Sequence, residues 1–213
     1  MSLTGIATDP RVLLFDVGGV LVQLSGVATM LGWMGEKATS DEMWRMWLHS
    51  TPVREFETGR IGAEEFAAAV TAEFRLPVDP QQFLASFTGW VTGLYPGTLE
   101  MLAQIPSRYQ RAVLSNNNVL HWTRVVDDLK LGPAFSHHFV SHLTGRIKPD
   151  AEAFQHVVES LGARPEHVLF LDDNALNVEA ARRFGMQAVR VQGISETRAA
   201  LIERGIIEEG GPA

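Results

Sequence analysis

Four short polar stretches, each at or just after the end of an apolar run, contain residue types that could carry out chemistry. Asp16 is the only polar side chain in LLFDVGGVLV, and burial of a lone carboxylate is unfavourable unless a cation or a metal offsets it. The other three stretches are LSNNN, GRIKPD and FLDDNALN, which contribute Ser115, Asn116, Lys148, Asp172 and Asp173.

Together, these residues predict metal-assisted phosphoryl transfer. Asp16 can act as a carboxylate nucleophile, and Asp16 with Asp173 can bind a hard divalent cation through oxygen. The Ser115 hydroxyl can bind phosphate oxygens, and Lys148 can neutralise both the phosphate and the carboxylate. Each residue alone has an ordinary structural interpretation, such as a strand end or a helix cap. The combination is what indicates chemistry.

The elements that must position these residues are strands that alternate with helices. Amphipathic segments such as AEAFQHVVESLG, which Asp150 can begin and Gly162 can end, follow the apolar runs. This alternation predicts an α/β fold with a parallel sheet covered by helices on both faces. The expected strands are Val12–Phe15, Arg111–Ser115, His138–Ser141, Val168–Leu171 and Ala188–Val191.

The segment 23–95 breaks this alternation, because it contains helix signals and no convincing strand. We therefore predict an all-helical cap over 23–95, inserted into a core domain formed by 1–22 and 96–213. Helical spacing predicts that the methionine and tryptophan side chains of this segment form the core of the cap: Met30, Trp33, Met34, Met43, Trp44, Met46 and Trp47.

The composition excludes several classes of function. The chain has 213 residues and a formal net charge of −7, so it has no general attraction to nucleic acid. The absence of cysteine excludes disulfides, thiolate metal sites and cysteine nucleophiles, and agrees with a cytoplasmic location. No apolar run is long enough for a membrane helix, and no secretory signal is evident. We expect a small phosphorylated substrate and no membrane or nucleic-acid partner; the oligomeric state is left open.

In their order along the chain, FDVGGVLV, LSNNN, GRIKPDAEAF and FLDDNALNVEAAR resemble the motifs of the haloacid dehalogenase-like hydrolase superfamily. The likeness is to the branch with a small helical cap that includes sugar-phosphate phosphatases. It implies a Rossmann-like core, with Asp16 as the nucleophile that becomes phosphorylated. It also implies that Ser115 binds the transferring phosphoryl group beside Asn116, and that Lys148 stabilises nucleophile and phosphate.

The resemblance also implies Mg²⁺ as cofactor. Asp16, Asp173 and the backbone carbonyl of Gly18 would be its ligands, and Asp172 would support the site while facing away from the metal. Gly18 and Gly19 have no side chains, so they allow the backbone to approach a ligand, and Gly19 is predicted to contact substrate with Asn116. Asn177 occupies a position where the family often has another acid, and is expected to play a supporting role.

Gly18 is the main departure from the family pattern. Most phosphatases of the family have there a second aspartate that moves protons, and loss of such a group slows a reaction by about 10² to 10⁴. We therefore expect slow turnover of substrates with poor leaving groups, which Gly18→Asp would raise. If turnover of such substrates is fast, another residue must transfer the protons, and His121 is the first to test. The histidines in this part of the sequence are otherwise typical of loop or surface positions.

Two other functions are compatible with the sequence. A 2-haloacid dehalogenase would use a similar aspartate and lysine without a metal, and it also lacks the second aspartate. The Asp172–Asp173 pair disfavours it, because acids repel a carboxylate substrate. A binding or regulatory protein that has lost turnover is the third possibility, which Gly18 favours.

Overall fold

The computed structural model describes residues 9–35 and 39–209. Its centre is a parallel sheet of five strands in the order β5-β4-β1-β6-β7, which confirms the predicted α/β fold. The strands are β1 (Val12–Phe15), β4 (Gln110–Ser115), β5 (His137–Val140), β6 (Val168–Asp172) and β7 (Gln187–Arg190). All five were predicted from the apolar runs, with bounds that differ by at most one residue at either end.

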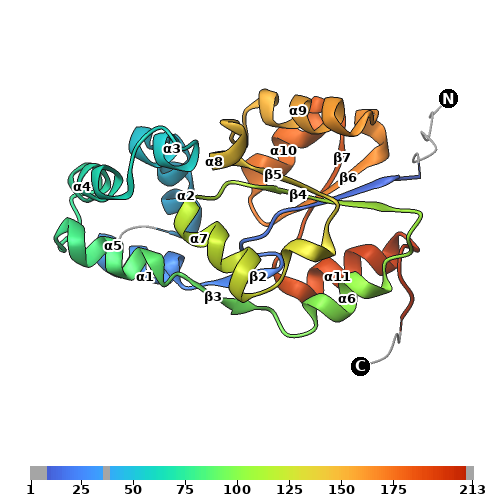
Figure 1. The fold of residues 1–213 in the computed structure, drawn as a ribbon, viewed down its shortest axis with the longest axis horizontal. Coiled ribbons are helices and arrows are strands. Elements are labelled where there is room, and N and C mark those ends of the chain that lie inside the picture. Colours follow the sequence, from blue (N-terminus) through green and yellow to red (C-terminus); the bar gives the residue numbers. More distant parts are fainter. Residues whose placement is uncertain (1–8, 36–38, 210–213) are drawn as a thin grey trace.

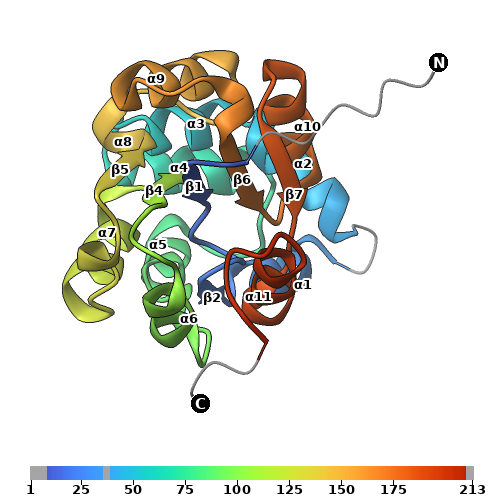
Figure 2. The ribbon, with the colours of Figure 1, turned by 90° about the vertical axis from the view of Figure 1, so that its right-hand side faces the viewer.

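Helices cover both faces of this sheet (Figures 1 and 2), with α9 and α10 on one face and α6 and α11 on the other. No helix in the described part of the chain has the length and apolar character needed to cross a membrane. The helices of the core are α6 (Thr98–Gln104), α7 (Val119–Thr123), α8 (Ser141–Thr144), α9 (Ala151–Leu161), α10 (Ala175–Phe184) and α11 (Gly193–Glu203), with shorter helical turns at Arg124–Asp128, Gly132–Ala134 and Pro165–His167.

Strand β1 is buried on both of its faces, because successive side chains point to opposite sides of a strand. Leu13 and Phe15 belong to the cluster beneath α6 and α11, whereas Val12 and Leu14 belong to the cluster beneath α9 and α10. This two-sided burial explains why β1 contains only apolar residues, and it fixes the strand that carries Asp16 at its end.

The inserted segment forms a second helical unit, seen at the left of Figure 1. Its helices are α1 (Gly26–Met34), α2 (Ser40–His49), α3 (Thr51–Glu57), α4 (Ala63–Glu73) and α5 (Pro80–Thr88). They share an aromatic core that includes Trp47, Phe66 and Phe87. Met30 and Met43 are buried in it as predicted, but Met46 is 47% exposed, so the prediction is wrong for that residue.

The prediction that 23–95 contains no strand is wrong at both ends. β2 (Val22–Leu24) and β3 (Val91–Leu94) pair as an antiparallel ribbon, so the chain leaves the core and returns to it side by side. The backbone groups at this crossing are thereby paired with each other. The domain bounds 1–22, 23–95 and 96–213 stay a prediction, and residues 1–8, 36–38 and 210–213 lie outside the described part.

The strand order reverses at β1, because the chain next builds β4 and β5 on one side of it and later β6 and β7 on the other. In open α/β sheets, ligands bind at the carboxyl ends of the strands beside such a reversal. The residues at the carboxyl ends of β1, β4 and β6 are therefore the place to look for chemistry.

Candidate active site

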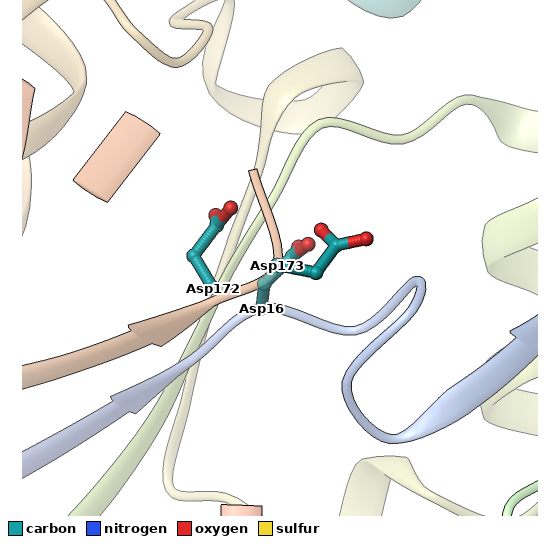
Figure 3. Close-up of side chains that lie close together, drawn as sticks. All are labelled: Asp16, Asp172 and Asp173. Carbon is teal, nitrogen blue, oxygen red and sulfur yellow. The ribbon is translucent and has the colours of Figure 1, made fainter. Parts of the chain in front are cut away.

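Three carboxylates meet at the carboxyl ends of β1 and β6 (Figure 3). Asp16 directly follows β1, Asp172 is the last residue of β6, and Asp173 comes next. Each offers an oxygen atom, and these three oxygens all lie within 4.8 Å of one another. The backbone N–H of Asp16 donates to the carbonyl of Leu171 at 2.9 Å, which ties the two strand ends together.

Lys148 is buried against this cluster, with 1% of its side chain exposed. Its Nζ lies 2.9 Å from Oδ1 of Asp16 and 2.6 Å from Oδ2 of Asp172. Burial acts to lower the pKa of Lys148, but the two carboxylates outweigh it and raise that pKa above the ordinary value. Lys148 is therefore charged at every physiological pH, and it bridges two of the three acids.

The cluster still carries more negative charge than Lys148 can neutralise. Burial raises the pKa of Asp173 to about 8, with Asp16 and Asp172 adding to the effect. Burial also raises the pKa of Asp16 to about 6, against the opposing effect of Lys148. A buried oxygen of Asn177, Oδ1, has no partner among the described residues. Clustered carboxylates and a free amide oxygen are hard oxygen donors, so the site fits a divalent cation such as Mg²⁺.

Asp172 lies within the cluster, and the expectation that it points away from the metal stays a prediction. It is fully buried, and Oδ2 accepts from Lys148 while Nδ2 of Asn177 lies 3.1 Å from both of its carboxylate oxygens. Its Oδ1 also accepts from the backbone N–H of Asn174 at 2.8 Å. Asp172 thus holds Lys148 in place from within the cluster and bonds to Asn177, and the supporting role of these two residues stays a prediction.

Gly19 serves the site by leaving room for Asp173. A Cβ atom on Gly19 would lie 2.2 Å from Oδ2 of Asp173, and its φ of +74° is one that favours glycine. Its N–H donates to the carbonyl of Val22 at 2.9 Å, and its carbonyl accepts from Gly193 at 2.7 Å. Both backbone groups of Gly19 are thus bonded within the protein, and its predicted contact with substrate stays a prediction.

Asn116 holds the backbone of Lys148, and its predicted role in binding substrate stays a prediction. Its Oδ1 accepts from the backbone N–H of Lys148 at 2.8 Å, and its Nδ2 donates to the carbonyl of the same residue at 2.9 Å. The side chain is thus used to hold the Lys148 backbone beside β4. Ser115, the last residue of β4, is buried and lines the cavity next to Asp16.

A cavity of about 120 Å³ lies over the carboxylates, between the cap and the core. Most of the predicted site residues line it: Asp16, Gly18, Ser115, Asn116, Lys148, Asp173 and Asn177. The cap contributes a mainly apolar side, with Met30, Trp47 and Trp90 among its residues. The polar residues predicted from sequence thus line one cavity together, and Trp44 and Trp47, which were assigned to the cap core, line it as well.

Two further titratable residues line the cavity. His121 is buried, with Nε2 lying 2.6 Å from the carbonyl of Phe87 and Nδ1 lying 3.3 Å from Nδ2 of Asn118. It therefore connects core and cap, and is not a loop residue. Glu57, on α3 of the cap, is buried and was missed. The signal was its spacing, because Val53, Phe56 and Glu57 follow the i, i+3, i+4 pattern of one buried helix face.

Residues 10–185 match the family model of haloacid dehalogenase-like hydrolases, a range that contains all four polar stretches. The chain belongs to this hydrolase family. It is 27% identical over 192 residues to phosphoglycolate phosphatase 1 of Pseudomonas aeruginosa, which covers 84% of this chain and 68% of that protein. It is 26% identical over 197 residues to (S)-2-haloacid dehalogenase of Xanthobacter autotrophicus, covering 87% and 76%.

Solved structures of haloacid dehalogenase (HAD) enzymes share the fold. A HAD family enzyme of Bacteroides thetaiotaomicron, solved with magnesium and inorganic phosphate, has a TM-score of 0.66 at 23% identity, covering 86% of this chain and 94% of that one. The L-2-haloacid dehalogenase of Xanthobacter autotrophicus has a TM-score of 0.62 at 22% identity, covering 85% and 77%. The family's phosphatases and its dehalogenases are thus both similar to this hydrolase, and its own residues must decide between them.

Proposed function

We propose that this hydrolase is a Mg²⁺-dependent phosphatase of a small phosphorylated metabolite, acting through an aspartyl-phosphate on Asp16. The observation that carries the proposal is the charge balance of the site. Lys148 pairs with two of the three clustered carboxylates, Asp16 and Asp172, and the remaining excess of negative charge suits a bound divalent cation and, with it, a phosphate. A metal-free reaction on a carboxylate substrate would leave that excess unbalanced.

The residues of the site have distinct parts in this reaction. Oδ1 of Asp16 is bonded to Lys148, so Oδ2 is the oxygen that attacks phosphorus. The bond from phosphorus to the leaving oxygen breaks as the bond to Asp16 forms. Water then attacks phosphorus, the bond to Asp16 breaks, and phosphate leaves. Lys148 and the Ser115 hydroxyl stabilise the negative charge on the phosphoryl oxygens during both steps.

Asp16, Asp173 and the Gly18 carbonyl are the groups that would hold Mg²⁺, with Asn177 near them. When bound, the ion neutralises charge on the phosphoryl oxygens and on the carboxylates. Asp172 already accepts hydrogen bonds from Lys148, Asn177 and Asn174, so it holds the lysine and leaves the metal to its neighbours.

The cavity suits a small substrate. Its volume of about 120 Å³ leaves room for a phosphoryl group and a short organic part, and its cap side is mainly apolar. The relatives named as phosphatases include phosphoglycolate phosphatases of two further Pseudomonas species and a D-ribitol-5-phosphate phosphatase of Bacteroides thetaiotaomicron. These names support a phosphorylated metabolite and leave its identity open.

The test is a screen of phosphorylated metabolites and 2-haloacids, with and without Mg²⁺. We expect the wild-type protein to release phosphate only with Mg²⁺, and Asp16→Asn, which removes the attacking oxygen, to release none. Halide release without metal would instead establish the dehalogenase alternative. Release of neither phosphate nor halide would support the third possibility, a binding or regulatory protein that has lost turnover.

A further inference from the structure

Glu57 is a buried carboxyl group that the reaction described above does not use. It lies at the end of α3 and lines the same cavity as Asp16 and Lys148. Its Oε1 accepts from Nε1 of Trp47 at 3.3 Å, while its Oε2 is buried with no partner in the part of the chain that the structure describes. A buried polar atom without a partner is unfavourable, so its presence beside a reaction centre calls for an explanation.

Two contacts hold α3 against the core close to Lys148. Arg54, one turn before Glu57, forms an ion pair with Asp150, two residues after Lys148. Gly59, two residues after Glu57, lies so close to α8 that a Cβ atom there would be 3.0 Å from the carbonyl of His142. Glu57 lies between these two contacts. The cap therefore brings the carboxyl group of Glu57 into the cavity near Lys148 and Asp16, whose charges act on it.

The other titratable residues of the cavity are already engaged. Asp16 is the nucleophile, Lys148 bridges two carboxylates, and Asp173 belongs to the proposed metal site. Both ring nitrogens of His121 already form hydrogen-bond contacts, Nε2 with the carbonyl of Phe87 and Nδ1 with the side chain of Asn118. Among the described residues that line the cavity, Glu57 is thus the titratable group left to exchange a proton with substrate.

The position that usually carries the proton-transferring aspartate holds no acid in this protein. Gly18 has no side chain, and a Cβ atom there would lie 2.7 Å from Cδ1 of Leu24. The end of the Leu24 side chain would thus have to move before an acid at residue 18 could fit. The reaction still requires a proton donor, because an alkoxide is a poor leaving group without one.

We propose that Glu57, contributed by the cap, is the general acid and base of this hydrolase; the proposal rests on the phosphatase function proposed above. In the first step the Glu57 carboxyl proton moves to the leaving oxygen as its bond to phosphorus breaks, which yields an alcohol and the Glu57 carboxylate. In the second step this carboxylate takes a proton from the attacking water. The bond from phosphorus to Asp16 then breaks, and the acid form of Glu57 is restored.

The electrostatic surroundings of Glu57 suit both halves of this cycle. Burial raises its pKa to about 7, and Trp47 opposes this by hydrogen bonding. The charged groups that act on it are Lys148 and Arg54, which favour the carboxylate, and Asp16, which disfavours it. An acid–base group works best when its pKa lies near the working pH, so that both protonation states are available.

The test compares the phosphorylation step for two leaving groups in wild type, Glu57→Gln and the control Glu55→Gln. Glu55 lies on the same helix, is partly exposed and is not among the residues that line the cavity. The probes are 4-nitrophenyl phosphate, whose leaving group needs no proton, and an n-alkyl phosphate. Rapid mixing with Mg²⁺ measures the first turnover, and thermal melting checks that each variant is folded.

For Glu57→Gln we expect the first turnover of the alkyl phosphate to slow by about 10² or more. A burst of about one nitrophenolate per site should remain, followed by slow turnover, because dephosphorylation then lacks its base. Glu55→Gln should behave as wild type. In wild type itself, the alkyl reaction should fall above about pH 7 while the nitrophenolate burst does not, a result that depends on no variant.

Unchanged alkyl turnover in Glu57→Gln, or an equal loss of both first turnovers, would overturn the role of Glu57 while leaving the phosphatase function intact. An alkyl reaction in wild type with no decline above pH 7 would also count against it. If wild type releases no phosphate from any ester with Mg²⁺, the proposed function fails, and the role of Glu57 fails with it.

Discussion

A Cβ atom on Gly19 would lie 2.2 Å from Oδ2 of Asp173, so residue 19 must be glycine for Asp173 to keep its place. We expect Gly19→Ala to displace this carboxylate, and a displacement of about 1 Å in an active site can lower the rate about 10²-fold. Steady-state phosphate release, together with the Mg²⁺ concentration required for half-maximal activity, measures the effect.

Gly205→Ala is the matched control for backbone strain. Gly205 also has a positive φ, +64°, and a Cβ atom there would meet nothing within 4 Å. Both variants should lose stability by about 1–2 kcal/mol, because a left-handed conformation is unfavourable for alanine. Only Gly19→Ala should lose activity, and equal activity losses in the two variants would contradict the steric explanation.

Lys148→Met removes the cation between Asp16 and Asp172. Two buried carboxylates are then left without their partner, which is expected to lower the free energy of unfolding by about 3–5 kcal/mol. Urea unfolding without metal measures this loss, and Lys130→Met, at an exposed lysine, is the control. A Lys148→Met protein as stable as wild type would mean that the carboxylates do not depend on this lysine.

Glu57 should make stability depend on pH in a defined direction. Burial raises its pKa from 4.5 to about 7, so the folded protein binds the proton more tightly than the unfolded chain. Stability therefore falls as the pH rises from about 4.5 to about 7, and the full effect is about 3 kcal/mol. Glu57→Gln removes this term, so its melting temperature should exceed that of wild type at pH 8 but not at pH 4.5, measured with EDTA.

Gly18→Asp distinguishes the two possible sources of a proton. Since Glu57 already supplies one, Gly18→Asp should not accelerate the alkyl phosphate reaction in wild type, contrary to the expectation from sequence. In the Glu57→Gln variant, Gly18→Asp combined with Leu24→Ala, which makes room for the new side chain, should recover a large part of the alkyl phosphate rate that Glu57→Gln loses. The quantity compared is kcat/KM for the alkyl phosphate. A strong gain from Gly18→Asp in the protein that keeps Glu57 would contradict the proposed role of Glu57.

The core of the fold could be predicted because its signals are local. β1 and β6 are short apolar runs that end in acids, and a parallel sheet brings those ends together whatever the details of packing. Asp16, Ser115 and Asp173 lie at or beside such strand ends, and with Lys148, from the loop after α8, they line one cavity.

What the sequence did not predict depends on contacts between distant segments. β2 and β3 pair although the helices of the cap separate them in the sequence, and Val22–Leu24 resembles the end of the preceding apolar run. The amide of Asn116 bonds the backbone of Lys148, 32 residues away, and no local pattern indicates that partner. Glu57 reaches the cavity only because α3 docks on the core through Arg54 and Asp150.

The most direct test of the account is to look for the phosphoryl group on Asp16. Wild type and Asp16→Asn are mixed with 4-nitrophenyl phosphate and Mg²⁺, quenched in acid and digested. The masses of their peptides are then measured by mass spectrometry. Glu57→Gln, in which dephosphorylation should be slow, is included to let the intermediate accumulate. The account predicts one added phosphoryl group on the peptide that contains Asp16, absent from Asp16→Asn. Phosphate release by wild type, with that peptide unmodified in both wild type and Glu57→Gln, would contradict it.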